Sequence, residues 1–339
     1  MRAIEYTARG GPEVLTLVER PVPQPGVGEV RVRVHVSGVN PTDWKAREGG
    51  GRGPVKEPQV PNQDGAGVID TVGPGVDAGR VGERVWVWEA HFQRSDGTAQ
   101  DYVTIPARQA VALPDDASLE LGASLGIPAL TAHRALTLAD GGPSRLAPGA
   151  LNGRTVLVAG GAGAVGNAAI QLARWAGARV AATVSGPEKA ALAAAAGAHR
   201  VVNYRDQDAA AQIHEFAPDG VNLIVEVAPA RNAELDLAVL ALGGTVAYYA
   251  VTQSDETLSL PASQLQVRNL AWHGVLVYMV STAQKDAAVA DVSAAVAAGA
   301  LRAGAEAGLP LHRFPLERAA DAHRAVQDGA VGKVLIDLV

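Results

Sequence analysis

The stretch that decides the fold lies near the middle of the chain, at residues 155–166. It reads Thr155-Val156-Leu157-Val158-Ala159-Gly160-Gly161-Ala162-Gly163-Ala164-Val165-Gly166. The first five residues form a compact apolar run that predicts a buried strand. Residues 161–166 then fit the pattern G-x-G-x-x-G, and an alanine-rich helical pattern continues to Trp175. Strand, glycine turn and helix therefore follow in the order of a dinucleotide-binding unit.

Glycines in such a turn let the backbone bend tightly and approach a pyrophosphate, whose charge rests on the N-terminus of the following helix. A bare match in a chain with 38 glycines also fits an ordinary tight turn. The order of the surrounding elements favours the nucleotide. The cofactor-binding candidates in this turn are Gly161, Ala162, Gly163, Ala164 and Val165.

The next expected strand, Arg179–Thr183, decides which nucleotide is bound. Proteins that bind NAD usually place an acid about 20 residues after the motif, where it accepts a hydrogen bond from the ribose 2′-hydroxyl. No acid stands there, and Ser185 can instead donate to a 2′-phosphate, with Lys189 one helical turn later on the same face. Tyr204 and Arg205 follow the third strand as further donors. Taken alone, Lys189 would be interpreted as a solvated surface lysine. Together with the missing acid, it predicts that the chain binds NADPH rather than NADH.

Outward from this unit, apolar strands alternate with helical patterns. Such an alternation predicts a parallel sheet covered by helices on both faces. The expected strands are Thr155–Ala159, Arg179–Thr183, Arg200–Asn203, Val221–Val227, Thr245–Tyr249 and Ala271–Tyr278.

The first third of the chain is rich in β-patterns. Val30–Val36 alternates apolar and polar residues with period two, which predicts a half-buried strand. Further short apolar runs at Gly67–Val72 and Arg84–Trp88 are separated by glycine and proline. At the other end, two helical patterns follow Thr282, and a final strand is expected at Lys333–Leu338.

The amino-acid composition argues against several classes of protein. A length of 339 residues suggests about two domains, and 48% hydrophobic with 19% charged residues is typical of a soluble globular protein. No apolar run approaches the ~20 residues that span a bilayer, and Glu5 stands where a signal peptide would be apolar. We therefore expect a cytoplasmic protein without a membrane partner. The net charge of −6, without a basic stripe, argues against a nucleic-acid partner.

Several chemistries are disfavoured by the residues present. The chain has no cysteine, which excludes disulfides, a catalytic thiol and a thiolate-bound metal, and no two of its 8 histidines are four positions apart, as in a helical zinc site. Gly122–Gly126 matches the G-x-S-x-G pattern of a serine nucleophile but follows an expected helix start at Ser118, so we assign it to packing. No tyrosine is followed four positions later by lysine, which excludes the tyrosine–lysine pair of short-chain dehydrogenases.

Four further motifs surround the glycine turn. Residues 37–43 read Ser-Gly-Val-Asn-Pro-Thr-Asp, residues 64–68 Asp-Gly-Ala-Gly-Val, residues 126–132 Gly-Ile-Pro-Ala-Leu-Thr-Ala, and residues 332–335 Gly-Lys-Val-Leu. They are similar to G-V-N-P-x-D/E, D/E-x-A-G-V, G-I-P-x-x-T-A and G-K-x-x-L of the medium-chain dehydrogenase/reductase superfamily. Over essentially its whole length the chain resembles the zinc-less quinone oxidoreductases of that superfamily, the relatives of zeta-crystallin.

The resemblance implies an α/β protein of two domains. A discontinuous catalytic domain with a GroES-like β-barrel would cover residues 1–127 and 277–339. A Rossmann domain with a doubly wound parallel sheet would cover residues 128–276, with NADPH in the cleft. Relatives are commonly homodimers joined through the edge of the Rossmann sheet, here about Ala271–Tyr278, although the pattern of this strand fits an internal position equally well.

The resemblance also implies site residues. Zinc-bearing relatives hold their metal with Cys, His and Cys, and the matching residues here are Asn40, Gln63 and Ile127, so no metal ligand is expected. The pyrophosphate would contact residues 163–165. The other cofactor-binding residues would be Ser185, Lys189 and Tyr204 at the 2′-phosphate, Asn40 and Thr131 at the nicotinamide, the backbone of Val275 and Leu276, the Lys333 side chain, and Tyr249 and Ala250 after the fifth strand.

Without a metal or an evident acid–base pair, the reaction must suit bare hydride transfer to a quinone or a similar conjugated carbonyl. Asn40 is expected to orient cofactor or substrate, while Asp43 fits a catalytic role and a loop-capping role equally. Trp44 could stack on a planar substrate or pack in the core. Tyrosines that relatives often carry near these positions are missing, and Ala250 replaces a usual glycine.

Two other functions stay open. An NADPH-dependent 2-alkenal or enoyl reductase would use the same hydride on an activated C=C bond, and residues such as Trp44, His91 and Tyr249 do not discriminate it from a quinone reductase. A non-catalytic NADPH-binding protein, structural or RNA-associated like some zeta-crystallin relatives, belongs to a different class, and the acidic balance argues against the RNA role.

Overall fold

The computed structural model describes residues 1–49, 53–206, 208–253 and 255–339. These form two compact units, the first of Met1–Ile127 with Leu311–Val339 and the second of Pro128–Pro310. The first change of unit follows Ile127, and the domain bounds that the resemblance implied stay a prediction. Residues 277–310 group with the second unit by their contacts, whereas the resemblance implied that they belong with the catalytic domain.

The first unit is built on an antiparallel sheet that its C-terminal residues complete. Its strands run in the order β14-β15-β3-β4-β5-β7, and β6 also pairs with β3. A separate pair, β1 with β2, lies outside this sheet. The strand bounds are β1 (Arg2–Glu5), β2 (Thr16–Glu19), β3 (Glu29–Val39), β4 (Asp64–Val72), β5 (Arg84–Val87), β6 (Tyr102–Pro106), β7 (Ala110–Ala112), β14 (Leu311–Pro315) and β15 (Lys333–Asp337).

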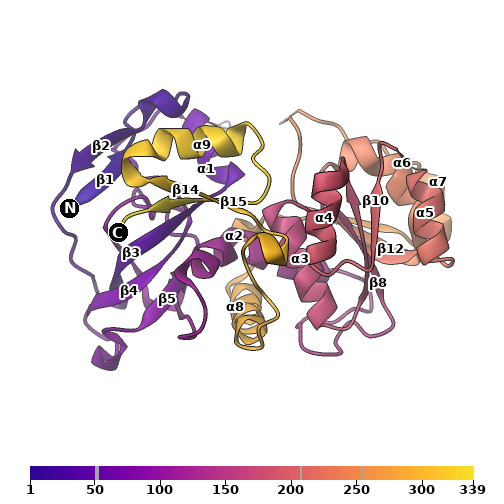
Figure 1. The fold of residues 1–339 in the computed structure, drawn as a ribbon, viewed down its shortest axis with the longest axis horizontal. Helices are drawn as coiled ribbons and strands as arrows, with labels where there is room; N and C mark the ends of the chain where they lie inside the picture. Colours follow the sequence, from indigo (N-terminus) through magenta and orange to yellow (C-terminus); the bar gives the residue numbers. More distant parts are fainter. Residues whose placement is uncertain (50–52, 207, 254) are drawn as a thin grey trace. The chain divides into compact units, whose positions relative to one another are not determined.

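The core of this unit follows the period-two pattern of the sequence. Val30, Val32 and Val34 of β3 are buried, with exposed fractions of 0%, 0% and 1%. Helix α1 (Pro41–Glu48) follows β3 directly, and helix α9 (Ala319–Gln327) packs on β14 and β15 (Figure 1). Helix α1 thus begins directly after Asn40, at the end of β3.

The second unit is built on a parallel sheet of six strands among the described residues. The order is β10-β9-β8-β11-β12-β13, which is that of a doubly wound dinucleotide-binding sheet. The bounds are β8 (Thr155–Ala159), β9 (Arg179–Val184), β10 (Arg200–Asn203), β11 (Val221–Glu226), β12 (Leu240–Tyr248) and β13 (Ala271–Gly274).

Helices cover both faces of this sheet. Figure 1 shows α3 and α4 on one face and α5 and α6 on the other, as the packing of each helix on its neighbouring strands requires. The bounds are α3 (Ala164–Trp175), α4 (Pro187–Ala195), α5 (Ala209–Phe216), α6 (Pro229–Val239), α7 (Ala262–Arg268) and α8 (Thr282–Ala297). The predicted α/β class, with a GroES-like and a Rossmann fold, is confirmed.

Three local expectations can be compared with these elements. Gly122–Gly126 lies inside helix α2 (Leu119–Leu136), which confirms that it is no nucleophile elbow. The predicted strand Ala271–Tyr278 is too long, because β13 ends at Gly274 and a 3-10 turn occupies Val277–Met279. β13 is an edge strand, a position that its sequence pattern left open.

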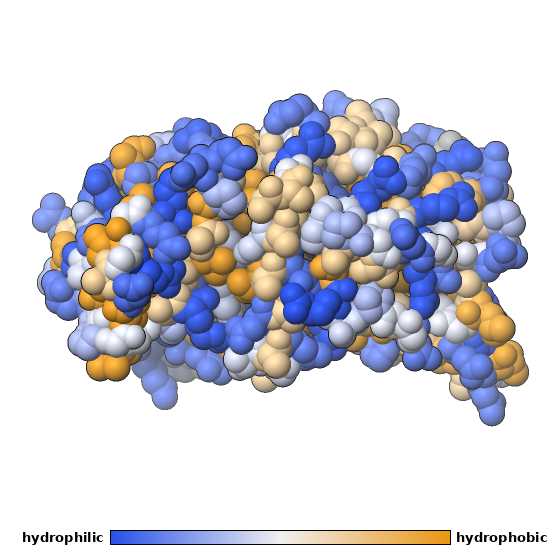
Figure 2. All heavy atoms as spheres, turned by 90° about the horizontal axis from the view of Figure 1, so that it is seen from below, coloured by the Kyte–Doolittle hydropathy of each residue, from blue (hydrophilic) through white to orange (hydrophobic). Residues whose placement is uncertain are grey.

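One face of the molecule is mixed in polarity. In Figure 2 hydrophilic and hydrophobic side chains are interspersed over the face seen from below. No helix in the described part of the chain is long and apolar enough to cross a membrane.

Candidate cofactor and active site

The glycine turn joins β8 to α3 as the sequence predicted. Gly160 follows the strand with φ of +71°, a left-handed conformation that favours glycine. Gly163 is the N-cap of α3 and has no side chain to cap it, so the first backbone N–H groups of the helix lack a side-chain partner there. Such N–H groups are the donors that anions use at a helix N-terminus.

The glycines of the motif differ in what surrounds them. A Cβ atom at Gly166 would lie 2.3 Å from Gly160 O, and one at Gly161 would lie 2.8 Å from the Ala182 Cβ atom. The surrounding atoms therefore leave no room for a side chain at Gly161 or Gly166. At Gly163 the nearest atom to a Cβ, Gly160 O, is 3.5 Å away, so its glycine leaves open space. Two glycines of the turn thus allow close packing and one leaves open space, and dinucleotide-binding turns use glycines in these two ways.

Ser185 and Lys189 lie together at the end of β9. Lys189 Nζ donates to Ser185 Oγ at 3.1 Å, and both side chains are half-buried. Tyr204 and Arg205 follow β10, the neighbouring strand, and are exposed; the Tyr204 N–H donates to Val184 O at 3.1 Å. The hydroxyl and the ammonium thus form the polar pair that the spacing predicted.

The other cofactor-binding candidates of the parallel sheet lie just after the carboxyl ends of its strands. The Tyr249 N–H donates to Glu226 O at 3.0 Å, and the Val275 N–H donates to Tyr248 O at 2.7 Å. Ala250 follows Tyr249, and Leu276 follows Val275 with 56% of its surface exposed. Because the strands are parallel, these residues, the glycine turn and Ser185 all lie at carboxyl ends of strands, where such sheets bind ligands. Thr131 is buried in α2.

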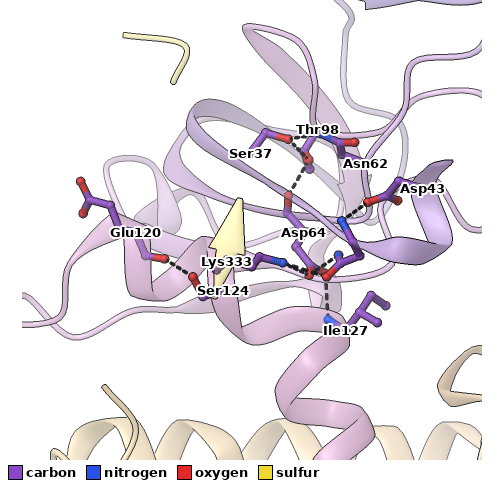
Figure 3. Close-up of polar contacts among 10 residues, drawn as sticks. Ser37, Asp43, Asn62, Asp64, Thr98, Glu120, Ser124, Ile127 and Lys333 are labelled. Carbon is purple, nitrogen blue, oxygen red and sulfur yellow. Dashed lines mark hydrogen bonds and ion pairs between the residues drawn. The ribbon is translucent and has the colours of Figure 1, made fainter. Parts of the chain in front are cut away.

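In the first unit residues of four motifs meet in one buried cluster (Figure 3). Asn40 lies between β3 and α1, Asp64 is the first residue of β4, and Lys333 is the first residue of β15. Asn40 Nδ2 donates to Asp64 Oδ2 at 2.7 Å, and Lys333 Nζ donates to Asn40 Oδ1 at 2.8 Å. Lys333 Nζ also lies 3.4 Å from Asp64 Oδ2, and Ile127 N–H donates to Asp64 Oδ1 at 2.8 Å.

The charges of this cluster depend on one another. Lys333 is 1% exposed and Asp64 is 0% exposed. Burial raises the pKa of Asp64, opposed chiefly by the Lys333 ammonium and by hydrogen bonds from Asn40 and Ile127. Burial likewise lowers the pKa of Lys333, opposed by Asp64 and Asp43. Each charge is therefore the main reason that its partner can stay ionised.

Asp43 caps the start of α1. Its Oδ2 accepts the Asn40 backbone N–H at 2.7 Å, while its Oδ1 is buried without a partner in the described residues. Burial and the nearby Asp64 raise the pKa of Asp43 to about 8. The structure thus shows the capping geometry, and a catalytic role for this carboxyl stays a prediction.

Trp44 follows Asp43 on α1 and is half-buried, with the Lys45 ammonium 5.7 Å from its ring centre. His91 Nε2 is hydrogen-bonded to Gln59 Oε1 at 3.1 Å. Both side chains belong to the first unit. Neither contact identifies a substrate, so the stacking role of Trp44 also stays a prediction.

The positions that match zinc ligands in relatives hold other contacts here. Asn40 and Ile127 both donate to Asp64, and Gln63 Oε1 accepts from the His91 N–H at 3.1 Å. Within the described residues no group of three or more His, Asp or Glu side chains is placed to hold a metal ion.

Two buried acids were not selected from the sequence. Asp64 was quoted only as part of a family motif, although an acid that starts an apolar strand is itself a signal. Glu226 ends the apolar strand β11 and accepts from the Ala228 N–H and from Asn232 Nδ2. Burial, together with the repulsion between Glu226 and Asp236, raises the pKa of Asp236. Glu226 therefore holds the turn between β11 and α6 at the carboxyl end of β11.

Comparison with known proteins agrees with both folds. Residues 26–115 match the alcohol dehydrogenase GroES-like domain, and residues 164–295 match the zinc-binding dehydrogenase domain. This combination of a GroES-like and a Rossmann fold defines a medium-chain dehydrogenase/reductase.

Full-length relatives refine this class. Quinone oxidoreductase from Rattus norvegicus is 33% identical over 344 residues, covering 99% of this chain and 97% of the relative. A quinone oxidoreductase from Thermus thermophilus, solved also with NADPH, has a TM-score of 0.80 and 30% identity over 100% of both chains. An NAD-dependent alcohol dehydrogenase has a TM-score of 0.85 and 29% identity, again over 100% of both. The chain belongs to the quinone oxidoreductase family, a family of oxidoreductase enzymes, and the predicted resemblance is confirmed.

Proposed function

We propose that this chain is an NADPH-dependent, zinc-independent reductase that passes a hydride to a quinone or a similar conjugated carbonyl compound. The observation that carries the proposal is the end of β9, where Ser185 and Lys189 form a hydroxyl–ammonium pair and no acid stands. An acid there would repel a 2′-phosphate, whereas an ammonium attracts it.

The residues present fit this cofactor. The open position at Gly163 and the helix start at Ala164 and Val165 would receive the pyrophosphate. Ser185, Lys189 and Tyr204 would bind the 2′-phosphate. Bound NADPH would supply the hydride. The remaining contacts, on the nicotinamide half, would come from Asn40, Thr131, Val275, Leu276 and Lys333.

The side chains of this protein would orient the reactants and supply a positive charge. The buried Lys333 ammonium, held by Asn40 and Asp64, would supply a fixed positive charge without a metal. Zinc independence is supported by the identity of Asn40, Gln63 and Ile127, none of which offers an imidazole or thiolate ligand. A quinone or enone oxygen would take its proton from water.

The acceptor is proposed to be a quinone because the full-length relatives carry that name and Trp44 offers a partly exposed aromatic face. A 2-alkenal would use the same hydride and needs no stacking face. Steady-state turnover of 9,10-phenanthrenequinone and of a medium-chain 2-alkenal would separate the two. A higher kcat/KM for the alkenal would replace the quinone assignment.

We also propose a homodimer through the free edge of β13. Apolar side chains shortly before and after β13 in the sequence are exposed, with exposed fractions of 72% for Val267, 56% for Leu276 and 72% for Met279. Pairing two such edges would satisfy their unpaired backbone groups and cover these side chains. Sedimentation equilibrium of the wild type and of Met279→Lys would test it, with dissociation expected for the variant.

The cofactor assignment is tested by titrating the protein with NADPH and with NADH while nicotinamide fluorescence is recorded. We expect NADPH to bind at least about tenfold more tightly than NADH, since a charge-assisted hydrogen bond contributes roughly 1.5–3 kcal/mol. Equal affinity for the two dinucleotides would contradict the roles of Ser185 and Lys189.

A further inference from the structure

The second unit holds a pocket that none of the cofactor-binding candidates lines. Its lining comes from the C-terminal half of α2, from α8 and from two connecting segments, all of them within the second unit. Leu130, Arg134 and Thr137 contribute from α2 and its end, and their spacing of four and three positions places them on one helix face. Thr131, the candidate at the nicotinamide, is about 100° round the helix from Leu130. The pocket is therefore separate from the proposed cofactor contacts.

Asp291 of α8 fixes the wall of this pocket. Its Oδ2 atom is hydrogen-bonded to His133 Nε2 at 2.8 Å and accepts the Leu146 N–H at 2.7 Å. Its Oδ1 atom accepts from Arg145 Nε at 2.9 Å. Burial opposes the charge of Asp291, but these hydrogen bonds lower its pKa to about 2. Asp291 therefore joins α8 to α2, and its carboxylate is already satisfied by donors other than Arg134.

The pocket is lined by two cations and, within the described part of the chain, by no acid. Arg134 is half-buried, and its guanidinium has no hydrogen bond or ion pair with any residue that the structure describes. Lys285 is 8% exposed, and its Nζ donates to Tyr278 O at 2.9 Å. The side chains around this pocket thus supply positive charge and no negative charge to balance it.

A comparison of two arginines shows that Arg134 is unusual. Arg145 is 56% exposed and is nevertheless paired with Asp291, which raises the pKa of its guanidinium. Burial lowers the pKa of Arg134, and no carboxylate opposes that shift. An arginine whose head reaches water needs no partner, but the head of Arg134 has lost part of its water without gaining an acceptor. An anion from solution would supply that acceptor.

The rest of the lining indicates what kind of anion fits. Leu130, Val277 and Ala288 are apolar and almost fully buried, with exposed fractions of 1%, 5% and 4%. Ser144 lines the pocket from an exposed position and offers a hydroxyl donor. An inorganic anion presents no apolar surface to the three apolar side chains, whereas the aliphatic part of an organic acid does.

We propose that this pocket binds a small organic carboxylate, with its charged end at Arg134 and Lys285 and its aliphatic part against Leu130, Val277 and Ala288. The planar guanidinium of arginine matches a carboxylate with two parallel hydrogen bonds. The site lies within the second unit alone. It does not rest on the proposed function, because the argument uses neither NADPH nor a quinone.

Isothermal titration calorimetry with hexanoate tests the proposal, and hexanamide serves as the uncharged probe of similar shape. We expect hexanoate to bind at least about tenfold more tightly than hexanamide, because only the carboxylate forms charge-assisted hydrogen bonds. Acetate should bind at least about tenfold more weakly than hexanoate, because it buries fewer methylene groups. Inorganic phosphate that binds more tightly than hexanoate would overturn the assignment to an organic carboxylate.

The variant Arg134→Gln removes the guanidinium that the pocket leaves without a partner. We expect hexanoate affinity to fall at least about tenfold, while the urea midpoint stays at the wild-type value because no ion pair is lost. Arg134→Lys keeps the charge without the planar fork and should bind hexanoate with intermediate affinity. Arg302→Gln is the matched control, since this exposed arginine of the second unit does not line the pocket and its loss should leave hexanoate affinity unchanged.

The proposal is overturned if hexanoate binds no better than hexanamide, or if Arg134→Gln binds hexanoate as wild type does. It is also overturned if Arg302→Gln loses as much affinity as Arg134→Gln. Hexanoate affinity should stay within about twofold when NADPH saturates the protein. Competition between the two would place the anion at the proposed 2′-phosphate site instead. A protein that binds hexanoate through Arg134 but shows no preference for NADPH would contradict the proposed function and support this inference.

Discussion

The glycine turn of the second unit and the Asn40 cluster of the first unit serve the same proposed cofactor but are assembled in different ways. The turn is a continuous stretch, and its geometry follows from a strand, three glycines and a helix start. The cluster joins side chains from β3–α1, β4 and β15, with 293 positions between Lys333 and Asn40. A local motif can be read along the chain, whereas a cluster of this kind exists only once the sheet has formed.

The two regions also differ in what holds them. The turn depends on the absence of side chains at Gly161 and Gly166. A Cβ atom at Gly161 would lie 2.8 Å from the Ala182 Cβ atom, and one at Gly166 would lie 2.3 Å from Gly160 O. The cluster depends on buried charges that compensate each other. Substitutions should therefore affect the turn through space and the cluster through charge, and this difference can be measured.

The largest effect is expected for Lys333→Met, which leaves the Asp64 carboxylate buried without its cation. Removing one partner of a buried pair costs roughly 3–5 kcal/mol of the free energy of unfolding. Urea unfolding followed by tryptophan fluorescence would measure it. Arg313→Met is the control, since that side chain is 50% exposed in its ion pairs and should cost at most about 1 kcal/mol. Equal losses for both variants would show that the cluster is no more than a surface pair.

A smaller effect is expected within the turn, where two glycines should behave differently. Gly166→Ala forces a Cβ atom to 2.3 Å from Gly160 O and should cost roughly 1–3 kcal/mol in unfolding free energy. Gly163→Ala meets only ordinary contact distances and should change stability by less than about 0.5 kcal/mol. The same Gly163→Ala protein should nevertheless bind NADPH more weakly, because the methyl group occupies the approach of the pyrophosphate. Normal NADPH affinity in Gly163→Ala would argue against this turn as the phosphate site.

The alternation of strands and helices, the glycine turn and the neighbouring placement of Ser185 and Lys189 could be predicted from local patterns, and the structure contains all three. The roles of these residues at a cofactor stay predictions. The predicted strand Ala271–Tyr278 ran too far because apolar residues continue beyond Gly274 into a 3-10 turn, and periodicity does not separate the two. Asp64 was passed over because its three partners are distant in sequence, and burial of an acid becomes visible only with those partners in place.

The next variant changes the Ser185–Lys189 pair and should alter cofactor binding alone. Lys189→Ala removes the ammonium beside Ser185 and should weaken NADPH binding about tenfold or more, while NADH binding stays within about twofold. Fluorescence titration with both dinucleotides would measure this, and Lys45→Ala, an exposed lysine of α1, is the control. A loss of affinity that is equal for NADPH and NADH would show that Lys189 does not contact the 2′-phosphate.

The remaining prediction concerns Asp43 and the pH dependence of stability. Its pKa is about 8 in the folded chain against an ordinary value of 3.8, so the folded state binds more protons between these values. The contribution of Asp43 to stability is therefore full at acid pH and is lost as pH rises toward 8, by at most about 1.4 kcal/mol per pH unit. Asp43→Asn, which resembles the protonated carboxyl, should gain stability relative to wild type between pH 5 and pH 8 in urea unfolding. A constant difference across that range would contradict the raised pKa.

The central claim is that hydride transfer to a quinone needs NADPH and no metal. It is tested most directly by treating the purified protein with a metal chelator, loading it with NADPH and mixing it rapidly with 9,10-phenanthrenequinone while the absorbance of the reduced nicotinamide is followed. We expect the bound NADPH to be oxidised at the same rate with and without the chelator. Oxidation that stops after chelation and returns with added zinc would contradict it.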